Sequence, residues 1–382
     1  MIGVVADDIS GAAELGAIGL RFGLRAELLT AGPVSSGAEL VCIDSDSRSC
    51  PPEEAGRRAA LAAQQLRAAG AEWIYKKVDS VLRGQVVAEV RAIQQQLGAA
   101  RTLLSPANPG LGRTVRGGQY FVRGSPLHET DFRFDPEFPR EVSTVLELLA
   151  DGGEAEVRMC RPGEPLPAVD IAVAEVANAD DVRHWATRLD SATLPAGAAE
   201  FFGAILEARG LNRIQAPKAA PVETGPELFV CGSTSGSTRQ FLATARSRGG
   251  PVLGLSRDLA CSPEGDMAES ERLANLIVRE LGAHPRVVLA LDLPPMGRAI
   301  GPRMAMRLAE VALAALAQVP NARVFAEGGA TAACLVRCAG WQRLEVVREY
   351  AQGVVGTIAP GQPARRFTLK PGSYVWPAEV EG

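Results

Sequence analysis

The sequence predicts an α/β protein of two domains, each with helices layered on a largely parallel sheet, and a cleft between the domains. Three observations support this prediction. Short β-branched runs alternate with Ala- and Leu-rich runs through most of the 382 residues, a pattern typical of parallel βαβ crossovers. The length exceeds that of one ordinary domain. A Pro-rich stretch near the middle interrupts the alternation, as linkers do.

The first half of the chain is expected to form one sheet with its helices. Strand Ile2–Ala6 leads into a loop at Asp7–Gly11 and a helix at Ala12–Phe22. The other β-branched runs predict strands at Ala26–Thr30, Leu40–Ile43, Trp73–Lys76, Thr102–Ser105 and Val169–Val173. Helical spacing of Ala and Leu predicts helices at Glu53–Ala69 (after Pro51 and Pro52), at Val86–Leu97, and near Asp181–Arg188 and Ala198–Ala208.

Residues Pro106–Pro139 break this pattern. They are rich in Gly, Pro and Arg and show only weak periodicity. A structureless stretch of this length inside a compact domain is usually functional. A loop that only packs over a sheet edge stays open as the alternative.

A domain boundary is expected at Gln215–Gly225, because the run APKAAPVETGP is Pro-rich and aperiodic. This assigns residues 1–215 to an N-terminal domain, 216–226 to a linker and 227–382 to a C-terminal domain. After the linker the alternation restarts. Strands are expected at Leu228–Cys231, Pro251–Leu255, Val287–Leu291 and Arg323–Glu327, and helices at Thr238–Ser247, Glu269–Leu281 and Met304–Ala317.

Composition and charge narrow the class of protein. Hydrophobic residues make up 47% and charged residues 22% of the chain, so it can bury sizeable cores. The net charge of -4 argues against nucleic acid or an anionic membrane surface as a partner. The N-terminus MIGVVADD has no basic region followed by a long apolar one. We therefore expect a cytoplasmic protein that contacts neither nucleic acid nor membrane.

Cysteine and histidine offer little support for a metal site. The seven cysteines are scattered and lack CxxC spacing; only Cys334 and Cys338 lie close together, with no histidine near them. Reduced thiols in the cytosol are the simpler account. The three histidines are isolated from one another, so neither a metal triad nor a Ser-His-Asp triad is expected.

Two polar motifs follow strands of the first domain. Asp7 and Asp8 come directly after the first strand and could accept hydrogen bonds from sugar hydroxyls or hold Mg²⁺. The alternative is helix capping by Asp8 or Ser10. The segment Lys76–Gly84 gathers cations, a carboxylate, a hydroxyl and a guanidinium, which suits an anionic ligand with hydroxyl groups. Its Arg83 could grip a carboxylate with two hydrogen bonds, although a surface ion-pair cluster remains the alternative.

A third motif, Asp44-Ser45-Asp46-Ser47-Arg48, contains a DxD pattern. Taken alone, this pattern suggests a phosphatase in which Asp44 is the nucleophile and Asp46 the acid or base. Such a pattern is a weak signal by itself.

Small-residue loops follow strands in the second domain. Gly232–Thr238 and Glu327–Ala332 each stand between a strand and a helix, and Lys370–Ser373 lies near the C-terminus. Small residues let the backbone approach phosphates, and a helix N-terminus favours negative charge. The Gly232–Thr238 loop is not a Walker A loop, because no GK[ST] sequence follows it. Plain Ser/Gly turns are the alternative interpretation. Two such loops in one domain indicate a nucleotide site.

These motifs together resemble the four-carbon acid sugar kinase family over nearly the whole chain. ADDISGA at Ala6–Ala12, IDSDSR at Ile43–Arg48 and KKVDSVLRG at Lys76–Gly84 resemble its N-terminal motifs, and the last is the most specific. The segment Ser105–Phe132 resembles its Pro-rich loop, and GSTSGSTRQ at Gly232–Gln240, EGGATA and LKPGS resemble its later loops. The match at IDSDSR argues against the phosphatase interpretation.

The resemblance implies an N-terminal domain that binds an acid sugar and a C-terminal domain that binds the nucleotide. It implies transfer of a phosphoryl group from ATP, with Mg²⁺, to a hydroxyl of a short sugar acid. Arg83, helped by Arg48 or Lys77, would neutralise the carboxylate, and Asp8 and Asp79 would orient the hydroxyls, either of them serving as general base. Asp7 and Ser80 would complete the sugar site. The phosphates would lie near Ser233, Ser235, Gly328, Gly329 and Gly372.

Two other functions stay open at this point. One is a ligand-binding or regulatory homologue without transfer activity, which is suggested by Ala330, Tyr374 and Val375, where the late loops depart from the family pattern. The other is the phosphatase that uses Asp44. A homodimer is expected only because such assemblies are common.

Overall fold

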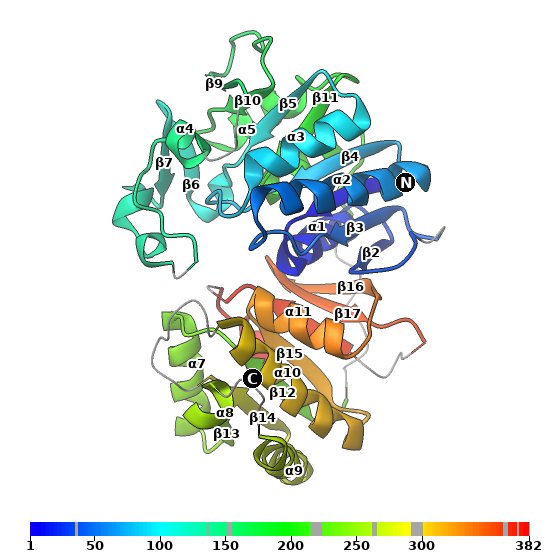
Figure 1. Cartoon of the computed structure of the whole chain (residues 1–382), viewed down its shortest axis with the longest axis vertical. Coiled ribbons are helices and arrows are strands. Elements are labelled where there is room, and N and C mark those ends of the chain that lie inside the picture. The colour runs from blue at the N-terminus through cyan, green and yellow to red at the C-terminus, as the bar shows by residue number, and fades with distance from the viewer. Residues whose placement is uncertain are drawn as a thin grey trace. The chain divides into compact units, whose positions relative to one another are not determined.

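The computed structural model describes residues 1–34, 37–135, 137–150, 155–214, 224–261, 266–291, 301–361, 366–372 and 374–381. The chain forms two compact units, Met1–Gln215 and Ala216–Gly382. Each unit has α/β architecture with a mostly parallel sheet, so the predicted fold class is confirmed (Figure 1). The predicted linker lies outside the described residues up to position 223, and so does Ser373.

The sheet of the first unit has the strand order β2-β3-β1-β4-β11-β5-β10-β9, and every neighbouring pair is parallel. Its strands are β1 (Ile2–Ala6), β2 (Ala26–Leu29), β3 (Leu40–Asp44), β4 (Trp73–Lys77), β5 (Arg101–Ser105), β9 (Val157–Cys160), β10 (Ile171–Ala174) and β11 (Thr193–Gly197). Strands β9 and β11 were not predicted. The short β11, TLPAG, carries a proline and a glycine, which are normally depleted in strands.

The helices of this unit pack in two groups. Helices α2 (Pro52–Ala68) and α3 (Val86–Leu97) lie side by side, as Figure 1 shows. Helix α6 (Ala199–Ala208) packs against α1 (Ile9–Arg21) and against α5 (Ala179–Ala186). A short helix α4 (Val145–Leu148) completes the set described in this unit.

Helix α1 begins at Ile9, three residues earlier than predicted. The backbone of Asp8 is extended, and its Oδ1 accepts a hydrogen bond from the N–H of Gly11 at 2.9 Å. This contact satisfies one of the free N–H groups of the first turn. The predicted loop Asp7–Gly11 is therefore mostly the first turn of a helix.

The segment after β5 is structured, so the prediction of a structureless loop at Pro106–Pro139 was wrong. It contains 3₁₀ turns and a small antiparallel sheet with the order β6-β7-β8. Its elements are η1 (Pro109–Leu111), β6 (Arg113–Arg116), β7 (Gln119–Val122), β8 (Ser125–Pro126), η2 (Leu127–Glu129) and η3 (Asp131–Phe134). Gly117 and Gly118, both with positive φ, join β6 to β7. A Gly-Gly pair is a hairpin signal that the weak periodicity of such short strands concealed.

The sheet of the second unit has the order β13-β14-β12-β15-β18-β17-β16. The strands are β12 (Glu227–Cys231), β13 (Val252–Gly254), β14 (Arg286–Ala290), β15 (Arg323–Glu327), β16 (Arg343–Ala351), β17 (Val354–Ile358) and β18 (Arg366–Lys370). The neighbouring strands in the part β13-β14-β12-β15-β18 of this order are parallel. Strand β17 pairs antiparallel with both β18 and β16. The antiparallel strands were not predicted.

The second unit has a buried aromatic core and the following described helices. They are α7 (Gly236–Ser247), α8 (Arg257–Cys261), α9 (Met267–Ala283), α10 (Gly301–Gln318), α11 (Gly329–Cys338) and α12 (Ala378–Glu381). In the core the rings of Phe229 and Phe325 stack with centroids 4.5 Å apart, and Trp376 meets both rings edge-on. Stacked and edge-on aromatic pairs are favourable beyond the area they bury.

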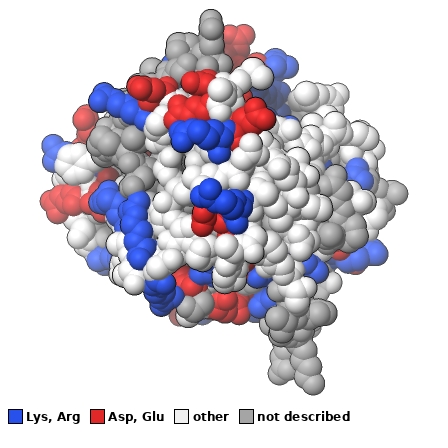
Figure 2. All heavy atoms as spheres, turned by 90° about the horizontal axis from the view of Figure 1, so that it is seen from below, with Lys and Arg blue, Asp and Glu red and all other residues white. Residues whose placement is uncertain are grey.

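The hydrophobicity of the helices and the distribution of surface charge bear on possible partners. None of the described helices is both long and apolar enough to cross a membrane. On the face drawn in Figure 2, acidic and basic side chains form small mixed groups between wide uncharged areas.

Candidate active site

The three polar motifs of the first unit meet at one edge of the sheet. Strand β1 lies between β3 and β4, and its last residue, Ala6, is in register with Asp44 and Lys77. All three strands are parallel, so the segments that follow them leave the sheet at the same edge. Ligands of open α/β sheets bind beyond the carboxyl ends of the strands.

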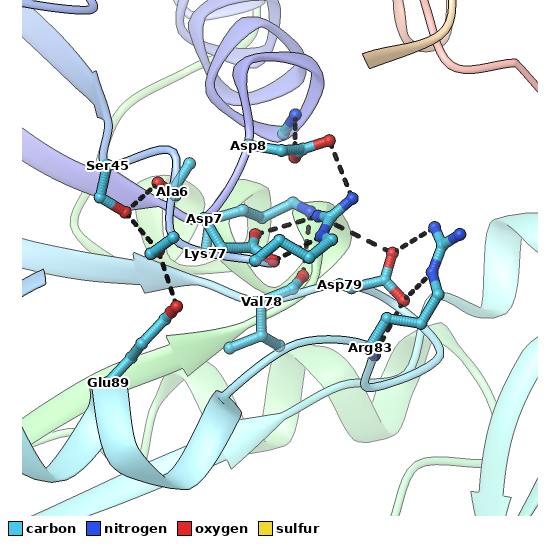
Figure 3. Close-up of polar contacts among 12 residues, drawn as sticks. Ala6, Asp7, Asp8, Ser45, Lys77, Val78, Asp79, Arg83 and Glu89 are labelled. Atoms are coloured by element: carbon cyan, nitrogen blue, oxygen red, sulfur yellow. Dashed lines mark hydrogen bonds and ion pairs between the residues drawn. The ribbon is translucent and has the colours of Figure 1, made fainter. Parts of the chain in front are cut away.

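Asp7 and Asp8 share one guanidinium. Arg48 donates from Nε and Nη2 to the two oxygens of Asp7, at 2.6 and 3.0 Å, and from Nη1 to Oδ2 of Asp8 at 2.9 Å. Asp7 is buried, whereas the side chain of Asp8 is 19% exposed. Figure 3 labels the two aspartates, and Arg48 joins them by the hydrogen bonds given above. Asp7 therefore positions Arg48, and Asp8 reaches the surface of the site.

Asp79 and Arg83 form a second such pair. Arg83 donates from Nε and Nη2 to Asp79 at 3.1 and 2.8 Å (Figure 3) and from Nη1 to Oδ2 of Asp135 at 2.9 Å. The backbone N–H groups of Val81 and Arg83 also donate to Asp79. Leu82 turns the chain between them through a positive φ of 61°, which is uncommon for a branched side chain.

Burial and ion pairing have opposite effects on the pKa values of Asp7 and Asp79. Burial alone would raise the pKa of Asp7, but the charges of Arg48 and Lys76 outweigh it and lower the pKa. At Asp79 burial is likewise outweighed by Arg83 and Arg48, and the pKa lies well below its usual value. Both groups are thus ionised at neutral pH.

Lys77 and Ser80 lie beside these pairs. Lys77 is buried; its Nζ donates to the carbonyl of Val78 at 3.0 Å and lies 3.7 Å from a carboxylate oxygen of Glu14. The hydroxyl of Ser80 accepts a hydrogen bond from Nη1 of Arg113. The structure thus brings together all seven residues that the sequence proposed for the sugar site, namely Asp7, Asp8, Arg48, Lys77, Asp79, Ser80 and Arg83.

A buried polar chain supports the loop that carries Arg48. Lys76 pairs with Glu89 of α3, and both side chains are almost fully buried. Glu89 accepts a hydrogen bond from Ser47 at 2.7 Å, the hydroxyls of Ser47 and Ser45 lie 2.8 Å apart, and Ser45 donates to the carbonyl of Ala6 at 2.8 Å. Figure 3 shows Ser45 beside Ala6, with Glu89 below them. This chain ties α3 to the end of β1, where Asp7 begins.

Gly84 allows the loops to approach closely. It adopts a φ of +85°, and a Cβ atom there would lie 3.2 Å from Cγ of Arg48 and 3.4 Å from an oxygen of Asp7. A larger residue would be strained and would push against the Arg48–Asp7 pair. The close approach of these loops therefore explains why the KKVDSVLRG motif ends in glycine.

The geometry does not favour the phosphatase interpretation. Asp44 is buried, and burial together with the nearby charge of Asp46 raises its pKa to about 8. Its Oδ1 accepts a hydrogen bond from the N–H of Asp46 at 2.9 Å, so it closes a local turn. A carboxyl group that is mostly protonated at neutral pH is a poor nucleophile.

Sequence reasoning missed three side chains that complete the site: Glu14, Arg113 and Asp135. Glu14 lies in α1, where an acidic residue looks like ordinary helix surface. Arg113 and Asp135 lie in the segment that was predicted to have no structure. Two signals pointed to this region: the functional character expected of the segment and, for Arg113, the resemblance of Ser105–Phe132 to the family's Pro-rich loop. Neither assigned a role to an individual residue.

The small-residue loops of the second unit also meet at one sheet edge. Strand β15 lies between β12 and β18, and its last residue, Glu327, is in register with Cys231 and Lys370. The loops that follow contain Ser233 and Ser235, Gly328 and Gly329, and Gly372. Helices α7 and α11 begin directly after two of these loops. Two helix N-termini therefore stand at this edge.

Hydrogen bonds and close contacts tie the loops together. The carbonyl of Gly372 accepts hydrogen bonds from the hydroxyls of Ser235 at 2.8 Å and Ser233 at 3.4 Å. A Cβ atom at Gly372 would lie 2.8 Å from Oγ of Ser233, so only glycine fits without a shift. Gly328, with a φ of +99°, stands at the N-terminus of α11. The structure thus brings the five proposed nucleotide residues to one edge.

Among the described residues, Glu327 is an acidic side chain at this edge, and it is already engaged. Glu327 is fully buried; it pairs with Lys370 at 3.1 Å and accepts hydrogen bonds from Trp376 at 3.0 Å and from Thr238. Across the described parts of the chain, no three or more His, Cys, Asp or Glu side chains are grouped to hold a metal ion.

Comparison with known proteins identifies the family. The model of a sugar-binding N-terminal domain matches residues 2–199. The chain is 30% identical over 400 residues to the D-threonate kinase of Cupriavidus necator, covering 97% of this chain and 94% of that protein. The chain belongs to the four-carbon acid sugar kinase family.

Other members of this family match at similar length. The 3-oxo-tetronate kinase of Brucella melitensis is 24% identical over 408 residues, covering 98% of this chain and 92% of its own. A crystal structure of a Haemophilus influenzae protein, 20% identical, superposes with a TM-score of 0.72 over 97% of this chain and 96% of that one. This structural likeness shows that the two proteins share a fold.

Proposed function

We propose that the protein is an ATP-dependent kinase that phosphorylates a hydroxyl group of a short, four-carbon-like sugar acid. The observation that carries the proposal is the cluster of Asp8, Arg48, Asp79 and Arg83 at one sheet edge. It occurs in a chain that matches named sugar-acid kinases over nearly its whole length. Carboxylates and guanidinium groups side by side suit a ligand with both hydroxyls and a negative charge.

Asp8 and Asp79 would take different roles. Asp79 already accepts four hydrogen bonds and has a strongly lowered pKa, so it is a weak proton acceptor suited to orienting a hydroxyl. Asp8 accepts only two and is more exposed. We assign Asp8 as the general base that accepts the proton of the attacking hydroxyl. The transition state of phosphoryl transfer is loose, so a weak base suffices.

The basic residues would hold the ligand in place. A guanidinium has five N–H donors; Arg48 and Arg83 each use three of them on carboxylates. The remaining donors, with Lys77 and the hydroxyl of Ser80, are available to sugar oxygens. Correct placement of the acceptor hydroxyl supplies much of the rate enhancement in such reactions.

The nucleotide would bind at the small-residue edge of the second unit. Ser233, Ser235, Gly328, Gly329 and Gly372 would contact the phosphates, and the N-termini of α7 and α11 would favour their negative charge. Mg²⁺ would neutralise the phosphate charge as part of MgATP. Because Glu327 is engaged by Lys370 and Trp376, the ion would be held mainly by phosphate oxygens and water. Use of ATP also fits the cytoplasmic location expected from the sequence.

The test is ADP release with MgATP and a panel of D- and L-threonate, D-erythronate and their 3-oxo forms, with ATP binding measured separately by calorimetry. Turnover on one or a few acids is the expected result. ATP binding without turnover on any acid would favour the homologue that lacks transfer activity. The absence of both ATP binding and turnover would contradict the assignment of the nucleotide site. Light scattering on the same sample tests the expected homodimer.

A further inference from the structure

We propose that Arg113, on β6, binds the carboxylate of the substrate. This inference rests on the proposed sugar-acid kinase function and names a residue that the sequence-based mechanism did not include. It reassigns charge recognition from Arg83 and Arg48 to a side chain of the small antiparallel sheet.

The other cations of the site are already neutralised within the protein. Arg48 pairs with Asp7 and Asp8, and Arg83 pairs with Asp79 and Asp135. Lys76 pairs with Glu89, and Lys77 lies 3.7 Å from Glu14. An incoming carboxylate would meet the negative partners of these cations as well as the cations themselves. Like charges at such distances disfavour binding.

Arg113 differs from these cations. Within the described part of the chain its guanidinium has no carboxylate within 4 Å; it donates from Nη1 to the hydroxyl of Ser80. Its face lies over the ring of Phe132, with 5.6 Å between Cζ and the ring centroid. Arg83 stands over the same ring at 5.9 Å. The charge of Arg113 contributes to lowering the pKa of Asp79, which places it beside the proposed sugar site.

The geometry of Arg113 suits a carboxylate ligand. Of its five N–H donors, one is used by Ser80, which leaves donors on Nε and Nη2 for a planar, two-point contact. The aromatic ring of Phe132 holds the guanidinium plane in place, and this reduces the entropy lost on binding. The substrate carboxylate would thus lie next to Ser80, and the hydroxyls would extend toward Asp79 and Asp8.

The experiment compares Arg113→Gln, Arg113→Lys and the matched control Arg116→Gln. Arg116 lies on the same strand, is exposed and stacks on Phe121 at 4.7 Å. Calorimetric titration with D-threonate and D-erythronate measures Kd, and ADP release measures kcat and KM. We expect the Gln variant to lose about 100-fold in affinity and in kcat/KM, mainly through KM. The Lys variant keeps the charge but loses the planar fork and should lose about 10-fold. The control should match the wild type.

The outcomes separate this inference from the proposed function. A wild type that binds an acid but releases no ADP contradicts the kinase function, and the Kd values still test Arg113. An Arg113→Gln variant with unchanged Kd and KM overturns the inference while leaving the kinase function standing. If circular dichroism shows that the Gln variant is unfolded, the Lys variant decides, and an unchanged Kd for it overturns the proposal.

Discussion

Arg48 grips the carboxylate of Asp7 with two hydrogen bonds, from Nε at 2.6 Å and from Nη2 at 3.0 Å, in a site where Asp7 is almost fully buried. A buried carboxylate depends on such a partner, because without it the charge is poorly solvated.

Replacing Arg48 by Leu should lower the free energy of unfolding by about 3 kcal/mol, because Asp7 loses its partner while buried. Urea denaturation followed by circular dichroism measures this. The control is Arg25→Leu, since Arg25 and Glu39 form an exposed pair with side chains 75% and 50% exposed. The control should change stability by less than about 0.5 kcal/mol. Equal effects of the two substitutions would contradict the assignment.

Glu89→Gln should destabilise the protein by about 3 kcal/mol, because Lys76 is left charged and buried without its direct ion-pair partner. The double variant Lys76→Met, Glu89→Gln removes the charge as well and should recover most of the loss. Thermal unfolding of the single and double variants in a mutant cycle measures the coupling. A double variant that is as unstable as the sum of the two single variants would show that the pair is not coupled.

Stability should fall as the pH rises from about 4 to about 8 because of Asp44. Its pKa is raised from 3.8 to about 8 in the folded protein, so in this range the folded state holds a proton that the unfolded chain has released. Asp44→Asn removes this contribution. The variant should be more stable than the wild type at pH 8 and close to it at pH 4. Urea melts across this range test the prediction, and a pH-independent difference contradicts it.

Asp8→Asn should lower kcat by about 100-fold or more if Asp8 accepts the proton of the hydroxyl. Asp79→Asn should raise KM as well, because Asp79 also organises Arg83. Asp46→Asn is the control, since this side chain is 56% exposed. Steady-state kinetics with the preferred acid measures all three. Near-normal kcat in both Asp8 and Asp79 variants would remove the catalytic assignment.

Gly372→Ala should raise the KM for ATP by about 10-fold or more, because the added methyl group would press on Ser233 and open the small-residue loops. The control Gly282→Ala lies in helix α9, where a Cβ atom has open space. It should leave ATP binding unchanged and stabilise the helix slightly. Unchanged KM for ATP in the Gly372 variant would place the phosphates elsewhere.

The parallel strands and helices were predictable because their hydrophobic periodicity is strong. The run Ile2–Ala6 and the helix Val86–Leu97 were predicted with the bounds that the structure has. The convergence of Asp8, Arg48 and Asp79 also follows from simple rules, because parallel strands end at one edge.

The remaining features depend on contacts that a sequence does not display. The pairing of Arg48 with Asp7 rather than with a ligand depends on how two loops pack after the strands end. The hairpin that carries Arg113 is built from strands of only four residues, too short for periodicity to detect. The pKa of Asp44 depends on burial, which results from tertiary packing.

The attachment of the small antiparallel sheet has an evolutionary consequence. Its strand β6 joins the rest of the first unit through a pair of backbone hydrogen bonds between Val115 and Val176, outside the ladder of the main sheet. Insertions at the turn Gly117-Gly118, where an added Cβ atom meets nothing within 4 Å, would alter this segment without disturbing its buried Val115 and Tyr120. Divergent members of the family could thus change which acids they accept while keeping the same phosphoryl-transfer core.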